Sequence, residues 1–233
     1  PGSPLRCSFE VDTCAWSLGS TYLWTRLSGQ TATSGTGPTG AATGSYYVYT
    51  EASGNDRKVF VLTSPNVTLS EVTLLSFSYH MLGDTMGSLE MQLQSATEGW
   101  FSVWSIWGNQ GNEWLRAAVV IPPDTVAVRF VGITGTSWSS DISLDDFASS
   151  DMLPSIDFLA CDFERSTCAW AVSDSAWERV FGETPSGNGT YMYLSNASDL
   201  GREHEFASAL FNVSSSPLFF LFSYFVHEEH ARL

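Results

Sequence analysis

The stretch that decides the fold reads Leu75-Ser76-Phe77-Ser78-Tyr79-His80-Met81. Large apolar residues alternate along it with small or polar ones, and residues 89–94 and 126–131 repeat the alternation. Successive side chains of a β-strand point to opposite faces, so this pattern places one row of side chains on a core and the other toward solvent. We therefore predict strands at all of these segments.

Two other segments, residues 59–62 and 117–121, are apolar at every position or nearly so and favour strands that are covered on both faces. Turn-forming residues punctuate the chain between these segments, and no apolar stripe recurs at helical spacing. Many short strands with regular turns predict an all-β sandwich or jelly roll. Residues 28–43, rich in Gly, Ser and Thr, are predicted to form a long exposed loop.

The chain contains an internal repeat. The motif at residues 7–16, Cys-Ser-Phe-Glu-Val-Asp-Thr-Cys-Ala-Trp, returns 154 residues later at residues 161–170 with both cysteines at the same spacing. Further matches pair residues 24–26 with 177–179 and residues 47–49 with 191–193. A period of this length indicates a domain rather than a short solenoid repeat. We predict a complete module at 1–150, a short linker at 151–159 and an incomplete second module at 160–233, cut from a longer protein.

Composition and charge limit the partners. The formal net charge is -15 and only 15% of the residues are charged, so there is no basic face for phosphate groups. A nucleic-acid partner is therefore excluded. No apolar stretch is long enough to cross a bilayer, and we predict no membrane span in this chain, although its parent protein is expected to be membrane-associated.

The cysteines and the glycosylation sequons both indicate the secretory route. Each of the two C-x6-C pairs can close a short loop locally, so we favour the disulfides Cys7–Cys14 and Cys161–Cys168 over the other two pairings. Sequons of the type N-x-[ST] predict N-linked glycans at Asn66, Asn188, Asn196 and Asn212. Together these features predict an extracellular or cell-surface location.

Several motifs, taken in order, resemble those of the MAM domain family. They are Cys7, Phe9, Glu10, Cys14 and Trp16; Tyr47 and Tyr49; Leu75, Phe77, Tyr79, His80, Met81, Gly83, Met86 and Gly87; and the later Gly108, Gln110, Gly111, Trp114, Asp141, Asp145 and Asp146. The resemblance covers residues 6–148, and residues 160–233 resemble the first half of the family pattern.

The resemblance implies a jelly-roll β-sandwich of two antiparallel sheets, here in tandem modules. Such domains occur outside the cell in adhesion receptors, receptor phosphatases, neuropilins and meprin-type proteases, where they serve adhesion or oligomerisation rather than catalysis. One departure concerns a second disulfide that family members often carry. This chain has Leu74 at the position of one partner and no cysteine after Asp146 within the module, so both partners are missing together.

Carboxylates near the two ends of the module form a candidate cation site. If the first and last strands are neighbours, these carboxylates come close enough to supply the oxygen ligands that Ca²⁺ or Na⁺ prefers. The resemblance points the same way, since some MAM domains hold a structural cation. The predicted ligands are Glu10, Asp12, Asp141, Asp145 and Asp146. The alternative is that Asp146, expected on the apolar face of the last strand, caps a turn while the other carboxylates are solvated.

We predict a non-catalytic adhesion or assembly module of a secreted or cell-surface glycoprotein that contacts other extracellular protein modules, including copies of itself. One alternative is an accessory oligomerisation domain of an extracellular enzyme, such as a meprin-like protease or a receptor phosphatase. A weaker alternative is a glycan-binding module, which requires tryptophans exposed in a row; the candidates are Trp100, Trp104, Trp107, Trp114 and Trp138.

Overall fold

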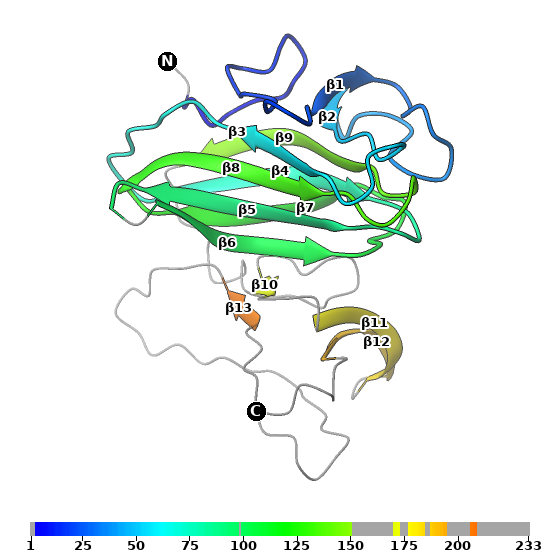
Figure 1. Ribbon diagram of the computed structural model, residues 1–233. Coiled ribbons are helices and arrows are strands. Elements are labelled where there is room, and N and C mark those ends of the chain that lie inside the picture. The colour runs from blue at the N-terminus through cyan, green and yellow to red at the C-terminus, as the bar shows by residue number, and fades with distance from the viewer. Residues whose placement is uncertain are drawn as a thin grey trace.

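The computed structural model describes residues 3–97, 99–150, 170–172, 177–184, 187–194 and 206–208, in which the regular elements are strands and no helix occurs. Within that part of the chain, nothing has the length and apolar character of a bilayer-spanning helix. The first module contains nine strands (Figure 1), which are β1 Thr25–Ser28, β2 Tyr46–Tyr49, β3 Val59–Thr63, β4 Thr73–Met81, β5 Ser88–Ser95, β6 Gly99–Trp107, β7 Leu115–Ile121, β8 Thr125–Ile133 and β9 Ile142–Ser150.

These strands form two antiparallel sheets packed face to face as a β-sandwich (Figure 1). One sheet has the order β1-β2-β9-β4-β7 and the other has the order β3-β8-β5-β6. The strands predicted from alternation are confirmed as β4, β5 and β8. In β5 the apolar residues are buried and the polar residues between them are half-buried, as a period of two requires.

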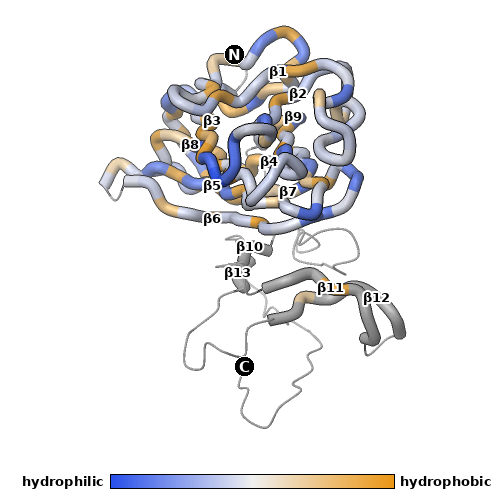
Figure 2. The backbone as a smooth tube through the Cα atoms, turned by 45° about the vertical axis from the view of Figure 1, so that its right-hand side comes forward, coloured by the Kyte–Doolittle hydropathy of each residue, from blue (hydrophilic) through white to orange (hydrophobic). Residues whose placement is uncertain are grey.

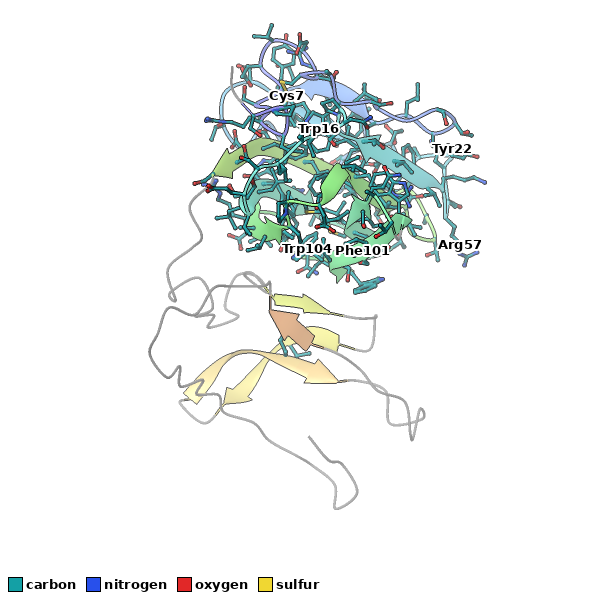
Figure 3. The ribbon with its side chains drawn as sticks, turned by 90° about the vertical axis from the view of Figure 1, so that its left-hand side faces the viewer. Cys7, Trp16, Tyr22, Arg57, Phe101 and Trp104 are labelled. Atoms are coloured by element: carbon teal, nitrogen blue, oxygen red, sulfur yellow. A yellow bond between two sulfur atoms is a disulfide. The ribbon has the colours of Figure 1, made fainter. Side chains whose placement is uncertain are left out.

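The core between the sheets is rich in aromatic rings. Phe77 of β4 meets Phe130 of β8 with ring centroids 4.8 Å apart and Trp104 of β6 with centroids 5.1 Å apart, both edge to face. Trp16 closes the core near the disulfide, with its ring 4.8 Å from that of Phe147 (Figure 3). Figure 2 shows hydrophobic segments inside the sandwich and hydrophilic ones in many of the connecting loops. Burial of this apolar surface supplies the main driving force for folding.

The prediction that residues 59–62 are covered on both faces is wrong. They form β3, which is an edge strand of the four-stranded sheet. Phe60 and Leu62 face the core and are buried, whereas Val59 points outward and is 47% exposed. Its apolar sequence therefore reflects β propensity rather than burial, because Val is favoured in strands on either face. In residues 117–121, now β7, every residue except the half-buried Ala118 is buried.

The loop predicted to be exposed is instead partly buried. Thr31 and Thr36 are each only 2% exposed, and the segment lies over the outer face of the five-stranded sheet. Trp114 donates its Nε1–H to the carbonyl of Gly40, and Tyr47 donates its hydroxyl hydrogen to the carbonyl of Gly29. Residues 29–45, called the covering loop below, therefore bury a second, polar layer of side chains on the far side of the sheet.

Only part of the predicted second module lies among the described residues. The strands described beyond residue 150 are β10 Trp170–Val172, β11 Trp177–Thr184, β12 Gly187–Leu194 and β13 Phe206–Ser208. In the first module Arg26 of β1 pairs with Val48 of β2, and at the positions matched by the repeat Arg179 pairs with Met192. The β11–β12 pair thus has the register of the β1–β2 pair. The predicted linker at 151–159 lies outside the described residues.

Candidate functional site: carboxylates that hold the covering loop

The N-terminal segment is a disulfide-closed loop rather than the strand that we expected to carry Glu10. Cys7 and Cys14 are bonded with their Cα atoms 5.6 Å apart, which confirms the first predicted disulfide. Phe9 is fully buried and has a φ of 58°, so the backbone turns there and places the ring in the core. Arg26 donates to the carbonyls of Phe9 and Glu10 at 2.6 and 2.8 Å, which fixes the loop to β1.

A β-bulge in β9 reorients Asp146. Ser76 pairs with Ala148 and Ser78 pairs with Asp145, so Asp146 and Phe147 both lie opposite the single intervening residue of β4. Asp146 has a φ of 53°, and Phe147 turns into the core. The expectation that Asp146 lies on the apolar face is therefore wrong, because the extra residue shifts the alternation by one position.

Three of the predicted ligands converge on residues 42–46, the end of the covering loop and the start of β2. Asp145 accepts the backbone N–H groups of Ala42 at 2.9 Å and Thr43 at 3.4 Å. Asp146 accepts the hydroxyl hydrogen of Thr43 at 2.6 Å. Glu10, from the disulfide loop, accepts the N–H groups of residues 45 and 46, both at 2.8 Å. Segments that are far apart in sequence thus meet at one loop.

The carboxylates have different electrostatic environments. Asp145 is 0% exposed, and its burial raises its pKa to about 7 even though three backbone N–H groups bond to it. Glu10 has its pKa lowered, mainly by the N–H groups of Tyr46 and Ser45. Burial penalises the charged form of a carboxylate, whereas hydrogen bonds to that form favour it. The surroundings of Asp145 therefore disfavour its charged form, whereas those of Glu10 favour it.

The other two predicted ligands lie elsewhere. Asp12 accepts the N–H of Cys14 at 2.7 Å within the disulfide loop. Asp141 is 0% exposed and accepts the N–H of Ala52 at 2.9 Å, and burial raises its pKa to about 6. Among the described residues, no three His, Cys, Asp or Glu side chains are grouped closely enough to hold a metal ion. The five residues therefore do not form one site, and a cation at Glu10, Asp145 and Asp146 stays a prediction.

The polar layer beneath the covering loop contains residues whose role sequence analysis missed. His80 is 1% exposed, its Nε2 lies 3.2 Å from Oδ1 of Asn112, and its ring lies 5.6 Å from that of Trp114. Its burial lowers its pKa. Its neighbour across the sheet is Ser143, which is also fully buried. The only signal in the sequence was the position of His80 on the polar face of its strand, which indicates solvent unless a loop covers it.

The tryptophans do not form an exposed row. Trp104 is 1% exposed and belongs to the core, whereas Trp114 packs against Tyr47 with ring centroids 5.8 Å apart. Arg129 lies 4.3 Å above the ring of Trp100, and Trp138 is 49% exposed beside the covering loop at Gly35. The glycan-binding alternative required a row, so this arrangement gives it no support.

The modification sites fall in both parts of the chain. Asn66 is exposed in the segment that follows β3. Asn188 lies in β12, and Asn196, Asn212, Cys161 and Cys168 lie outside the described residues. Occupancy of the four sequons and the second disulfide stay predictions.

Residues 7–151 match the family described as MAM domain, meprin/A5/mu. MAM domain-containing protein 2 from Homo sapiens is 35% identical over 154 residues, which cover 63% of this chain and 22% of that protein. Neuropilin-1a from Danio rerio is 37% identical over 145 residues, covering 57% of this chain and 16% of that protein. The matched part of the chain thus spans about a fifth of the length of these relatives.

Among solved structures, the K1 cleaved adhesin domain of Lys-gingipain from Porphyromonas gingivalis W83 is similar at a TM-score of 0.49 and 17% identity, covering 64% of this chain and 98% of that one. The matched range of 7–151 contains the disulfide loop, both sheets and the covering loop with its carboxylates. The chain belongs to the MAM domain family.

Proposed function

We propose that this chain is a non-catalytic adhesion or assembly module of a secreted or cell-surface glycoprotein, and that it works by contacting other extracellular protein modules. The observation that carries the proposal is the family match over residues 7–151, which covers the whole sandwich. Its relatives include MAM domain-containing proteins and a neuropilin. Fold alone does not determine function, so the surface of this module has to provide the contacts.

The structure supports a rigid binding module. The disulfide and Arg26 fix the N-terminal loop to β1, and the carboxylates of Glu10 and Asp145 fix the covering loop. Loops that are held in one conformation lose little entropy on binding, which favours affinity. A structural cation, Ca²⁺ or Na⁺, is part of the proposal. Its ligands would come from Glu10, Asp145 and Asp146, each of which bonds to residues 42–46.

The tandem arrangement is also proposed. Residues 160–233 repeat the first half of the module in sequence, and β11–β12 have the register of β1–β2. Two modules in one chain raise the effective concentration of the second contact once the first has formed, so weak contacts are strengthened.

Sedimentation velocity of the full chain across concentration, first with Ca²⁺ and then with a chelator, tests self-recognition. We expect association that increases with concentration, because copies of one module are the simplest extracellular partners. A monomer at all concentrations and in both conditions would contradict homophilic contact. Aggregation of beads coated with the chain, compared with beads coated with albumin, tests the same contact when many copies are presented together.

A further inference from the structure

Edge strand β3 has unpaired backbone groups. Thr63 lies opposite Arg129 of β8 but forms no backbone hydrogen bond with it. Its N–H and C=O point away from β8 instead, and both are bonded to Ser17. Alternate residues of an antiparallel strand bond to the same side. Val59 and Val61 therefore also direct their N–H and C=O groups away from β8. The described residues offer these four groups no hydrogen-bond partner.

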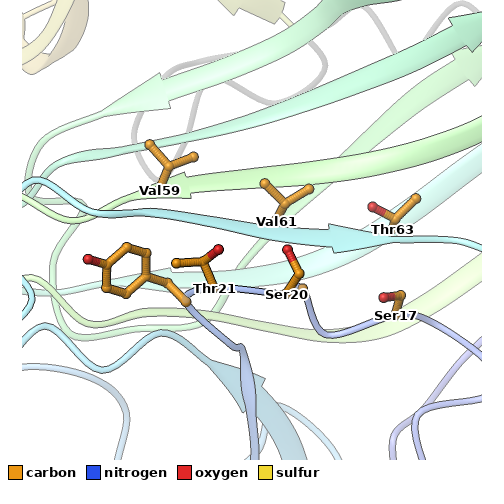
Figure 4. Close-up of a pocket in the computed structure, with 8 residues that line it drawn as sticks. Ser17, Ser20, Thr21, Val59, Val61 and Thr63 are labelled. Carbon is orange, nitrogen blue, oxygen red and sulfur yellow. The ribbon is translucent and has the colours of Figure 1, made fainter.

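A groove lies beside these groups. The segment at residues 17–22 pairs with β3 at Ser17 and then diverges from it, since Gly19 turns with a φ of 109°. The wedge between the two segments is a pocket of about 370 Å³. Figure 4 shows Val59, Val61 and Thr63 along β3, with Ser17, Ser20 and Thr21 on the neighbouring segment. One wall is therefore mostly apolar strand and the other carries hydroxyl groups.

The wedge is open at the Val59 end and closed at the other. A Cβ atom on Gly19 would lie 3.0 Å from the carbonyl oxygen of Val61, so the segment is close to β3 there. At the open end Val59 is 47% exposed and Leu23, in the segment opposite, is 53% exposed. An incoming chain thus has room for a short extended stretch and meets apolar side chains where it enters.

The entrance carries two neighbouring positive charges, Arg57 and Lys58. Residues 1–150 contain Arg6, Arg26, Arg57, Lys58, Arg116 and Arg129, and only the pair at 57–58 is adjacent. Arg57 is exposed, and Nζ of Lys58 lies 5.6 Å from the centre of the Tyr22 ring, which lines the groove. Figure 3 shows Arg57 and Tyr22 at the same end of the sandwich. Asp56 precedes the pair, which leaves a local excess of one positive charge in a chain whose net charge is -15.

We propose that β3 binds an extended segment of a partner protein, which pairs antiparallel with the open end of β3 at Val59 and carries acidic side chains at its C-terminal end. In the antiparallel orientation the C-terminal end of the added strand lies at the start of β3, beside Arg57 and Lys58. Backbone pairing at an open sheet edge supplies affinity, and the charges select the partner and its direction. This inference rests on the proposed function as a protein-contact module and assigns its binding edge.

The test uses the full chain and a fluorescein-labelled peptide, acetyl-Thr-Val-Thr-Val-Thr-Asp-Asp-amide, in fluorescence anisotropy titrations. A second peptide replaces both aspartates with lysine. We expect the acidic peptide to bind at least about tenfold more tightly than the basic one, because its aspartates meet Arg57 and Lys58 at the entrance of the groove. Added salt should reduce that difference, since exposed charges are screened.

Val59→Pro removes the outward N–H, and Val59→Thr is its matched control because it keeps the N–H and a β-branched side chain. Proline is tolerated at the first residue of an edge strand, so urea unfolding of both variants should show a folded protein. We expect roughly tenfold weaker peptide binding for Val59→Pro and little change for Val59→Thr, since a tenfold loss matches about one hydrogen bond. The double variant Arg57→Glu/Lys58→Glu provides an independent test if the proline variant does not fold.

Equal binding of the acidic peptide by the parent chain, Val59→Pro and the double charge variant would overturn the proposal. So would the absence of peptide binding by a folded chain. If sedimentation still shows self-association in that case, the protein-contact function stands and only the β3 assignment fails. If Val59→Pro abolishes self-association and excess acidic peptide does not affect it, the partner at β3 is a second copy of this chain rather than an acidic segment.

Discussion

Asp145 accepts the backbone N–H of Ala42 at 2.9 Å, although 103 residues separate them in the sequence. This bond connects the last strand of the module to the covering loop, and Glu10 provides a similar connection from the disulfide loop to the start of β2. The covering loop has little apolar side chain of its own with which to anchor itself. Its position therefore depends on polar contacts with specific partners.

We predict that Asp145→Asn destabilises the fold by about 1–3 kcal/mol at pH 7.5, because backbone N–H groups lose a buried acceptor. Urea unfolding measures the loss, and hydrogen exchange at Ala42 and Thr43 shows whether the covering loop opens. Asp124→Asn, in the exposed turn before β8, is the matched control and should change stability by less than about 0.5 kcal/mol. Equal stability of the two variants would show that Asp145 does not hold the loop.

We predict that the double variant Cys7→Ser/Cys14→Ser loses about 2–4 kcal/mol of unfolding free energy, the range typical of a native disulfide. The loop also positions Phe9 in the core, so its release should expose that ring. Urea unfolding checks the loss, with Ser8→Ala in the same loop as the control. If the double variant loses no more unfolding free energy than Ser8→Ala does, Arg26 and Phe9 hold the loop without the disulfide.

His80 should make the protein less stable as the pH falls. Burial holds its pKa in the folded state below the ordinary histidine value of about 6.5, so below that pH the unfolded chain binds a proton that the folded chain does not. Its contribution is present above about pH 6.5 and is lost as the pH falls through the folded-state pKa. We expect Tm to fall less between pH 7.5 and pH 5.5 in His80→Gln than in the parent chain.

The raised pKa values of Asp141 and Asp145 act in the opposite direction, because the folded state then binds the extra proton. Those contributions are common to both proteins in the His80 comparison, so the difference between the two Tm profiles isolates His80. Parallel profiles would indicate that His80 titrates equally in the folded and unfolded states.

If a cation binds at Glu10, Asp145 and Asp146, millimolar Ca²⁺ should raise Tm relative to chelator, because a ligand that binds only the folded state stabilises it. We expect Glu10→Gln to remove the rise. Asp12→Asn, whose carboxylate faces Cys14 instead, should retain it. A Tm that is the same in Ca²⁺, Na⁺ and chelator would contradict the cation, and the N–H groups at residues 42–46 would then be the sole partners of the carboxylates.

Glycosylation can be tested at the exposed sequon. A chain secreted by animal cells should carry a glycan on Asn66, because its side chain is exposed and lies outside the strands. Mass spectrometry before and after enzymatic deglycosylation measures occupancy, and Asn66→Gln should lose one glycan mass. An unmodified Asn66 in secreted protein would contradict the prediction for this sequon.

Local sequence was sufficient for β3, β4, β5, β7 and β8 and for the disulfide of the first module. Alternation at residues 75–81 predicts β4 because the pleat of a strand has a period of two, and close cysteines such as Cys7 and Cys14 can pair only if the chain turns between them. Glu10, Asp145 and Asp146 all bond to residues 42–46, whereas Asp12 and Asp141, which the sequence grouped with them, lie elsewhere, and the cation stays a prediction.

Only the tertiary structure decided the features that depend on what covers a strand. Residues 59–62 are apolar throughout and yet lie at an edge, because sequence does not show which strand is last in a sheet. The bulge in β9 moves Asp146 off the apolar face, and a single inserted residue leaves no mark in an alternating pattern. His80 is on the polar face and is nevertheless buried, because Asn112 and Trp114, from the segment between β6 and β7, pack against it. Periodicity reports the two faces of a strand, and long-range packing determines which face meets water.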